Sequence, residues 1–398
     1  MNRLVDDCLL LIFEQMYELH DLIRCHNVCR RWRYLIEIRL AKFRYMTIYD
    51  SSVSPHFETD RVPNEVLVNL KRLQYILGHT LRWKGDYVVP FHSVTKKTFP
   101  NLKIIHYDKS PGYRAIDFVM DALIVVYQTL PLRGIIEMSH DVAIPNTTRG
   151  LKGLKIYGSF RSNYVSFRPK LKQLRIANVA LHHLPAHCEE IPNLEILYLE
   201  VLECEELRRD PPLVYENLET LIVADHEKRS HSFLYELEVV NWCPKLKNAH
   251  FYLLNKTLDF TGEQFFKNPR LESLVIVFGA HSSWKWISLK THLYKYPNLK
   301  NLALRLYPEI SDSHVKELVQ NLPHLVTLDL RGCENITGHS VQLIESYSKR
   351  EKRSIKVHIG PKYDIPPRPR HWVGTGSNFM EAFFYQDQTP LILDNLED

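Results

Sequence analysis

The sequence has little of what usually marks a membrane or secreted protein. None of its apolar runs reaches the roughly 18 residues that a membrane-spanning helix needs. The first apolar run, Leu9 to Phe13, follows two acidic residues, whereas a secretory signal begins with basic ones. The seven cysteines are an odd number scattered through 398 residues, which is typical of free thiols rather than of a disulfide framework. We therefore expect a cytoplasmic or nuclear protein with no membrane partner.

The signature motifs of the common catalytic and nucleotide-binding sites are also missing. The chain contains no GxxxxGK(S/T), GxSxG or HExxH segment, and its 14 glycines are few for loops that cradle phosphate groups. Cysteine and histidine gather at residues 25–29 and 182–188, but neither group has the paired spacing typical of zinc ligands. We expect no enzymatic activity, no metal and no cofactor, and we expect Cys333 to pack as a small apolar side chain.

Neither sign of charge dominates the chain. Its 51 Lys and Arg residues and 46 Asp and Glu residues are interspersed and leave a net charge of +5, which does not indicate a nucleic-acid partner. The apolar content of 45% is sufficient for a sizeable core. We expect a globular protein of more than one part that binds other proteins and not nucleic acid.

A short phrase with the frame Leu-x-x-Leu-x-Leu recurs from about residue 99 onward. Its clearest copies include IPNLEILYLE, NPRLESLVIV and LPHLVTLDLR. The first leucine of each copy is found at Leu102, Leu151, Leu171, Leu194, Leu218, Leu246, Leu271, Leu299 and Leu325, with a looser copy at Leu132. Neighbouring copies are 19 to 30 residues apart. A period of about 20 to 29 residues in this frame is typical of leucine-rich repeats, in which each unit supplies one short parallel strand and a returning helix or loop.

This frame predicts an α/β solenoid with a curved parallel sheet inside and helices outside. The leucines point into the core, and the intervening strand residues point to the opposite, concave face. Residues 311–322 and 337–347 show apolar residues at helical spacing after a Ser or Thr that can cap a helix. Residues 354–360 are expected to form the last strand, and the apolar stripe in residues 64–77 indicates a helical capping unit before the array.

The first 40 residues predict three short amphipathic helices. Leu9, Ile12, Phe13 and Met16 share one helical face, and a second apolar stripe begins at Trp32. Asp6 and Asp21 are placed as N-caps. A unit of about 40 residues buries too little apolar surface to be secure alone. Its stripes therefore need either the neighbouring repeats or the helix of a separate partner.

These residues resemble the F-box, whose pattern runs roughly Leu-Pro, an acidic pair, Leu-x-x-Ile-Phe, Asp-Leu and Val-Cys-x-x-Trp. The corresponding segments here are Leu4-Val5, Asp6-Asp7, Leu9 with Ile12-Phe13, Asp21-Leu22 and Val28-Cys29-Arg30-Arg31-Trp32. Val5 stands where the family usually has proline. On this resemblance we divide the chain into an F-box at 1–45, a linker with a capping or degenerate first repeat at 46–98, leucine-rich repeats at 99–360 and a C-terminal tail at 361–398.

The resemblance implies a substrate receptor of an SCF-type, cullin-based ubiquitin ligase. The F-box would bind the Skp adaptor and through it a cullin-RING complex, while the repeats would hold the protein to be modified. The residues expected to bind the adaptor are Leu4, Leu9, Ile12, Phe13, Met16, Leu22, Val28 and Trp32. The alternative, which Val5 leaves open, is a repeat scaffold whose degenerate F-box recruits no ligase. Later segments, CPKL at 243–246 and residues 328–347, look like the cysteine-containing repeats that often follow an F-box.

The strand residues between the inward leucines are the candidates for substrate binding. They include Arg175, Tyr198, Tyr252, Arg305, Asp329 and Arg331. Because Arg can hold a carboxylate or phosphate with two parallel hydrogen bonds, we expect an acidic or phosphorylated substrate segment. The alternative is that these are ordinary solvated strand residues. The basic run at 349–353 is either a nuclear localisation signal or a solvated helix end. The C-terminal tail either lies as a strap over the solenoid or is a polyproline ligand for another protein.

Overall fold

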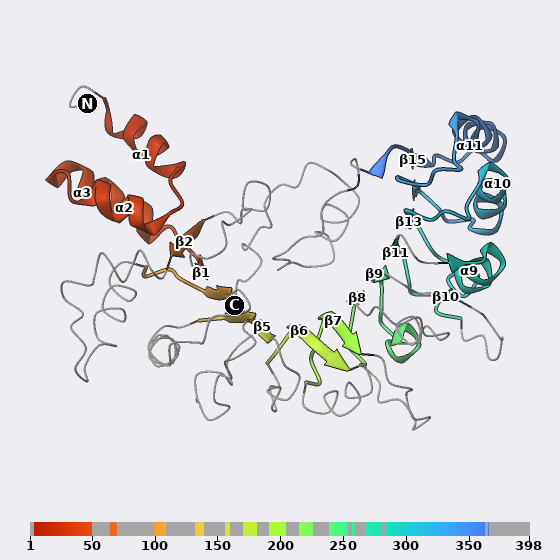
Figure 1. Ribbon diagram of the computed structural model, residues 1–398, viewed down its shortest axis with the longest axis horizontal. Coiled ribbons are helices and arrows are strands. Elements are labelled where there is room, and N and C mark those ends of the chain that lie inside the picture. Colours follow the sequence, from red (N-terminus) through yellow and green to blue (C-terminus); the bar gives the residue numbers. More distant parts are fainter. Residues whose placement is uncertain are drawn as a thin grey trace. The chain divides into compact units, whose positions relative to one another are not determined.

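The structure is a computed structural model of the chain (Figure 1). It describes residues 4–49, 64–69, 99–108, 132–138, 156–159, 170–180, 191–203, 215–225, 239–253, 257–258, 267–279, 283–362 and 365. The described residues up to Leu171 form one compact unit and those from Lys172 onward form another, and we refer to them as the first and second unit. Within the described ranges, no helix is both long and apolar enough to cross a membrane.

The first unit begins with three helices, α1 (Asp6–Glu14), α2 (Leu19–His26) and α3 (Arg30–Ala41). Asp6 and Asp21 lie inside the first turns of α1 and α2, whose N-cap positions are Val5 and Glu18, so the prediction that these aspartates are N-caps is wrong. Their carboxylates instead interact favourably with the positive ends of the helix dipoles. At α3, the Cys29 Sγ accepts the N–H of Trp32 at 3.5 Å.

A small apolar core holds the three helices together. Leu9 and Phe13 from α1 are buried together with Leu22 from α2 and Ile36 from α3. The rings of Phe13 and Trp32 meet edge to face, with centroids 5.3 Å apart. Burying each such aliphatic or aromatic side chain contributes roughly 1.5–3 kcal/mol. Sequence spacing therefore predicted the three helices correctly, and their shared faces form this core.

The rest of the first unit is a parallel sheet. Its strands are β1 (Tyr45–Tyr49), β2 (Glu65–Asn69), β3 (Ile104–Asp108), β4 (Gly134–Met138) and β5 (Ile156–Ser159), in the order β5-β4-β3-β1-β2. β2 begins the segment that was expected to be a helical capping unit. Its first residues form a strand because Val66 and Val68 are β-branched and bury fully beside β1, while residues 70–77 lie outside the described ranges.

The three helices are attached to the edge of this sheet. The connection between α1 and α2 runs beside β2, where the Leu67 N–H donates to the Tyr17 carbonyl at 2.9 Å and Glu18 forms a bridge with Leu67. The Tyr49 hydroxyl of β1 donates to the Glu18 carboxylate. Tyr17 also packs against the buried Tyr49 and Leu67, so the neighbouring sheet supports the connection between α1 and α2, as expected for a unit too small to be secure alone.

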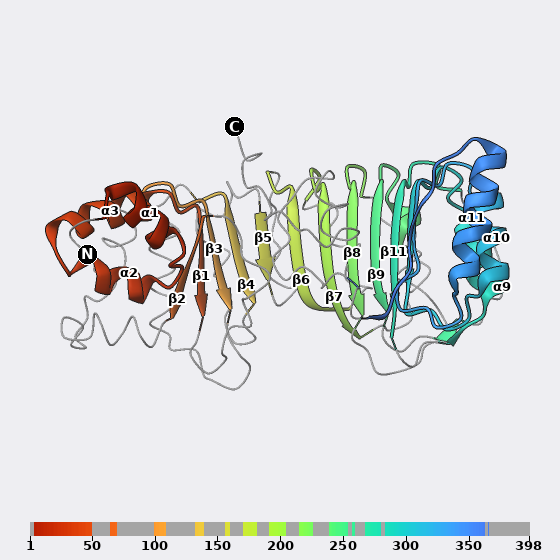
Figure 2. The ribbon, with the colours of Figure 1, turned by 90° about the horizontal axis from the view of Figure 1, so that it is seen from above.

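The second unit contains a parallel sheet of eight strands that run side by side (Figure 2). The strands are β6 (Gln173–Ala180), β7 (Ile196–Glu203), β8 (Thr220–Asp225), β9 (Asn248–Leu253), β11 (Ser273–Phe278), β13 (Asn301–Arg305), β14 (Thr327–Asp329) and β15 (Lys356–His358), in chain order across the sheet. A separate pair joins β10 (Thr257–Leu258) to β12 (Ser283–Trp284).

Helices lie along one side of the last strands of this unit (Figure 1). They are α9 (Trp286–Leu293), α10 (Asp312–Asn321) and α11 (Gly338–Glu351), preceded by the 3-10 turn η4 (Val239–Trp242). The helices predicted at 311–322 and 337–347 and the strand predicted at 354–360 are confirmed as α10, α11 and β15. The predicted fold class is confirmed: three N-terminal helices are followed by parallel sheet and helices in a solenoid-like α/β arrangement.

The leucine frame explains why consecutive repeats stack. In the second unit the second frame position of each repeat pairs with that of the next, so apolar residues form a row across the sheet. The row consists of Leu174, Leu197, Leu221, Ala249, Leu274, Leu302 and Leu328, all of them buried. Each repeat buries its leucines only against its neighbours, which is why a single repeat has no stable core of its own.

Polar side chains join the repeats outside this row. Among the described residues of the second unit, an asparagine amide donates to a carbonyl of the preceding repeat at four places. These bonds run from Asn217 to Pro192 at 2.9 Å, from Asn268 to Val240 at 3.4 Å, from Asn298 to Pro269 at 2.8 Å and from Asn335 to Pro308 at 2.7 Å. These bonds satisfy turn carbonyls that strand pairing cannot reach.

Candidate functional site

The outer surface of the three helices is one candidate site. Of the eight residues expected to bind an adaptor, Leu4, Ile12 and Val28 are exposed, with 49% of Ile12 and 61% of Val28 accessible. Leu9, Phe13 and Leu22 are buried in the core, and Met16 and Trp32 are half-buried. The expectation that Leu9 and Phe13 belong to an exposed stripe is therefore wrong. One helical turn separates them, so both point onto α2 and α3, while Ile12 lies on the flank of α1.

The exposed apolar residues at the start of the chain lie together on the solvent side of α1. Cys8, Leu11 and Ile12 are exposed and share one side of the helix, and Leu4 precedes Cys8 by one turn. We call these four residues the α1 face. Sequence reasoning missed Leu11, which is 61% exposed, because residues 9 to 13 are all apolar and the spacing did not separate the two sides.

Arg31 fixes the start of α1 against the start of α3. Its Nε donates to the Asp6 carboxylate at 2.7 Å, and its Nη2 donates to the Leu4 carbonyl. The ion pair is partly exposed and so contributes less than about 1 kcal/mol to stability. Its effect is positional, because it holds Leu4 close to the α2–α3 connection that carries Val28. Nothing in the sequence singled out Arg31 for this role.

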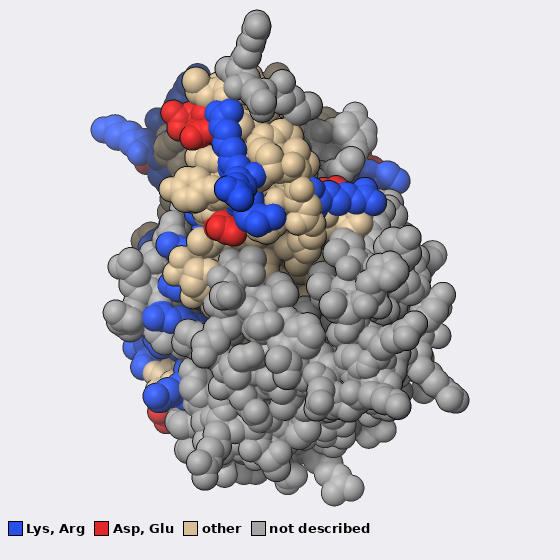
Figure 3. All heavy atoms as spheres, turned by 90° about the vertical axis from the view of Figure 1, so that its left-hand side faces the viewer, with Lys and Arg blue, Asp and Glu red and all other residues tan. Residues whose placement is uncertain are grey.

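Charged side chains lie on the outer surface of the helices among uncharged residues. Figure 3 shows an uncharged area over this part of the molecule with Lys and Arg side chains across and beside it. The exposed basic residues of the three helices and their ends are Arg24, Arg30, Arg33 and Lys42. Exposed apolar residues and Arg side chains on one surface are common in protein–protein interfaces.

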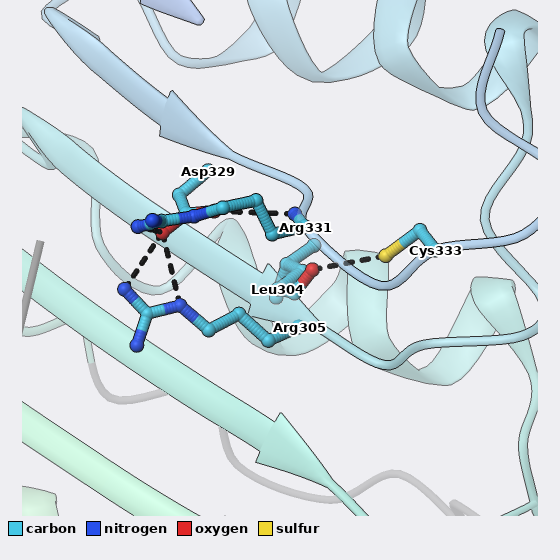
Figure 4. Close-up of polar contacts among 5 residues, drawn as sticks. All are labelled: Leu304, Arg305, Asp329, Arg331 and Cys333. Carbon is cyan, nitrogen blue, oxygen red and sulfur yellow. Dashed lines mark hydrogen bonds and ion pairs between the residues drawn. The ribbon is translucent and has the colours of Figure 1, made fainter. Parts of the chain in front are cut away.

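The candidate substrate residues at the end of the second unit form a buried charge cluster (Figure 4). Arg305 donates to one Asp329 oxygen through Nε at 2.9 Å and Nη2 at 2.7 Å. Arg331 donates to both Asp329 oxygens, through Nε at 2.9 Å and Nη2 at 2.7 Å. Only 1% of Arg305, 0% of Asp329 and 5% of Arg331 is exposed. The prediction that these residues are exposed on the concave face is therefore wrong.

The electrostatics of the cluster follow from this burial. Burial alone would raise the pKa of Asp329, but the hydrogen bonds and charges of Arg331 and Arg305 outweigh it and hold the pKa below its ordinary value. Burial lowers the pKa of Arg305, and Asp329 opposes that change. Burial and the Arg305 charge lower the pKa of nearby His250 to about 3, so this histidine is neutral. Two guanidinium groups thus share one buried carboxylate.

The other candidate substrate residues lie on earlier strands. Arg175 on β6 pairs with Glu200 on β7 at 2.8 Å, and its guanidinium lies 4.6 Å from the centre of the Tyr198 ring. Tyr198 is buried, whereas Arg175 and Tyr252 are half-buried. Strand register brings Arg175 and Tyr198 together. Tyr252 on β9 and the cluster of Arg305, Asp329 and Arg331 belong to other strands.

The surroundings of Cys333 work against activation of its thiol as a nucleophile. The Cys333 Sγ donates to the Leu304 carbonyl at 3.1 Å, and burial raises the pKa of this thiol to about 12. The prediction that Cys333 packs as a small apolar residue is confirmed. Within the described residues, no group of three His, Cys, Asp or Glu side chains could hold a metal ion, and the histidines at 182–187 lie outside them.

Comparison with known proteins identifies the helical part. Residues 4–46, which contain α1 to α3, match the family model described as F-box-like. No curated protein matches the chain. Among solved structures, the chain is similar to one in the crystal structure of the Rad7 and Elc1 complex in yeast, with 13% identity and a TM-score of 0.35 over 84% of this chain and 90% of that chain. So low a score carries no functional argument.

Proposed function

We propose that this protein is the substrate-recognition subunit of an SCF-type cullin-based ubiquitin ligase. The observation that carries the proposal is the F-box-like domain at residues 4–46, whose folded core leaves Leu4, Ile12 and Val28 accessible. These residues and Leu11 bind the Skp adaptor, which connects the chain to a cullin-RING complex. Leu9, Phe13, Leu22 and the half-buried Met16 and Trp32 support that surface from below.

In this proposal the second unit is an array of leucine-rich repeats that holds the protein to be modified. The row of frame residues and the buried Cys243 and Cys333 support the assignment to the cysteine-containing repeat type. The chain itself is a non-catalytic bridge, with ubiquitin transfer done by the cullin-RING partners in the cytoplasm or nucleus. Half-buried Arg175 and Tyr252 remain candidates for substrate contact, whereas buried Arg305 and Arg331 act through the fold.

The alternative is a repeat scaffold whose F-box no longer binds an adaptor. Val5 was the feature that favoured it, because the family usually has proline there. The backbone of Val5 has φ −70° and ψ 158°, which are angles that proline adopts. The substitution therefore leaves the start of α1 in the conformation that a proline would impose, which supports a retained adaptor surface.

A titration of the purified chain with purified Skp adaptor tests the proposal. Leu11→Glu and Ile12→Glu place a charge on the α1 face without touching the core, so both should fold and lose most adaptor affinity, because central apolar contacts dominate binding energy. Ile287→Glu is the matched control, since Ile287 on α9 is equally exposed. The proposal fails if the wild-type chain does not bind, or if the two α1 variants bind as tightly as the control.

A further inference from the structure

The outer side of α9 carries apolar and aromatic side chains that water can reach. Ile287 is 61% exposed, and Tyr294 at the C-cap of the helix is 37% exposed. Seven residues separate the two, which places both on one side of α9, about two turns apart. The exposed positions of the neighbouring helix α10 are polar instead, as at Lys316 and Gln320. α9 thus departs from the polar outer face that a surface helix usually presents.

Contacts with α10 hold the side chains around this row in place. The Trp286 ring stacks on the His314 ring of α10, with centroids 4.7 Å apart and an angle of 16° between the planes. The Trp286 Nε1–H donates to the Glu317 carboxylate at 2.9 Å. Lys290 pairs with the same carboxylate, and its Nζ lies 5.7 Å from the centre of the Tyr294 ring. Aromatic side chains that are already fixed lose little entropy when a partner binds.

The charges around the row favour an acidic partner. α9 contains no acidic residue, and the charge of Glu317 on α10 is balanced by Lys290. Asp312, the other acidic residue of α10, accepts hydrogen bonds from the start of α11. Lys285 at the N-cap of α9 and Lys316 on α10 are exposed, and neither forms an ion pair with a described residue. Two lysines therefore remain available to carboxylates of a partner.

We propose that the outer side of α9 binds an amphipathic helix of a partner protein whose apolar stripe is flanked by acidic residues. A helix fits because Ile287 and Tyr294 form a row along the axis of α9, and a second helix laid along it presents side chains at the same spacing. The apolar stripe packs on this row and on the accessible part of Trp286. The carboxylates lie beside Lys285 and Lys316.

This surface is separate from the one proposed to bind the adaptor. The α1 face belongs to the first unit, whereas α9 belongs to the second. A partner held on α9 is therefore bound in addition to the adaptor, and the proposal does not depend on the ligase function.

Fluorescence anisotropy with the full-length chain tests the site. The probe is a labelled synthetic helix of about 18 residues, with Leu in one stripe and Glu on both flanks. One control peptide has the same residues in an order without a stripe, and another has Lys in place of Glu. We expect only the striped acidic peptide to bind. Ile287→Glu should weaken its binding at least about tenfold, because it places a charge among the central apolar contacts.

Val326→Glu is the matched control variant. Val326 is also exposed and apolar in the second unit but lies directly before β14, outside α9, so Val326→Glu should change the affinity by less than about twofold. The paired variant Lys285→Glu, Lys316→Glu should weaken binding and reduce its dependence on salt, since it removes the charges that face the peptide. Melting temperatures equal to that of the wild type confirm that the variants fold.

Several results would overturn the proposal. These are no binding of the striped acidic peptide, equal binding of either control peptide, and equal weakening by Ile287→Glu and Val326→Glu. Binding of the chain to anionic lipid vesicles that Ile287→Glu abolishes, without binding of the peptide, would assign the surface to a membrane and also contradict it. Adaptor titration of Ile287→Glu separates these outcomes from failure of the proposed function, because the adaptor surface lies in the other unit.

Discussion

Asp329 carries two guanidinium groups in a place from which water is excluded. Asp329→Asn leaves Arg305 and Arg331 buried without a balancing charge, and we expect it to lower the free energy of unfolding by about 3–5 kcal/mol. Arg305→Met removes the excess charge and keeps the pair of Asp329 with Arg331, so its cost should be smaller. Urea unfolding of the two variants checks this order, and equal or reversed losses would contradict the account of the cluster.

The same carboxylate makes stability depend on pH. Because the folded-state pKa of Asp329 lies below its ordinary value, its contribution is fully present above about pH 4 and is lost as the pH falls through the lowered pKa. The wild-type chain should therefore lose more stability on acidification than Asp329→Asn. A paired Arg305→Glu, Arg331→Glu variant would place three acidic groups together in a buried position, so we expect it to fail to fold.

At the scale of elements, the start of α1 offers a test of the residue that departs from the F-box pattern. The Val5 carbonyl accepts from the Leu9 N–H at 3.2 Å, and proline keeps that carbonyl. Since the φ of Val5 already suits proline, Val5→Pro should raise the free energy of unfolding by about 0.4–1 kcal/mol. Adaptor affinity should equal or exceed that of the wild type.

Val28→Pro is the matched control for this substitution. Val28 is as exposed as Val5, but its N–H donates to the Cys25 carbonyl at 3.1 Å, so proline there removes a hydrogen bond and should destabilise the helices. We would compare the melting temperatures of both variants with that of the wild-type chain by thermal unfolding. A lower melting temperature for Val5→Pro would show that the start of α1 is not preorganised for proline.

Some of these elements could be predicted from the sequence alone, and others could not. The leucine frame predicted the strands of the second unit, because a row of leucines one repeat apart must bury against its neighbours. It could not predict that Arg305 and Arg331 turn to Asp329, since that pairing depends on the register of β13 with β14. The spacing of apolar residues around Val66 predicted a helix, but these residues form a strand because they pair with β1. In α1, the uninterrupted apolar run concealed which side forms the core and which side is the α1 face.

At the scale of the whole molecule, the described residues form two compact units, and the proposed adaptor surface lies in the first. The first unit anchors the F-box-like helices on a sheet edge through Leu67 and Tyr17, so deleting residues 1–45 would also uncover β2. Point variants on the α1 face are for that reason better probes than truncation. In the second unit, the buried Arg305 and Arg331 are paired with Asp329.

The most direct measurement of the bridge is a quantitative pull-down from cells that compares the tagged wild-type chain with its Leu11→Glu, Ile12→Glu double variant. The account predicts that the Skp adaptor and a cullin co-purify with the wild-type chain and are lost together from the variant, while the other partners keep their wild-type ratios. It is contradicted if the adaptor and cullin are absent from the wild-type sample, or if they remain bound to the variant at unchanged amounts.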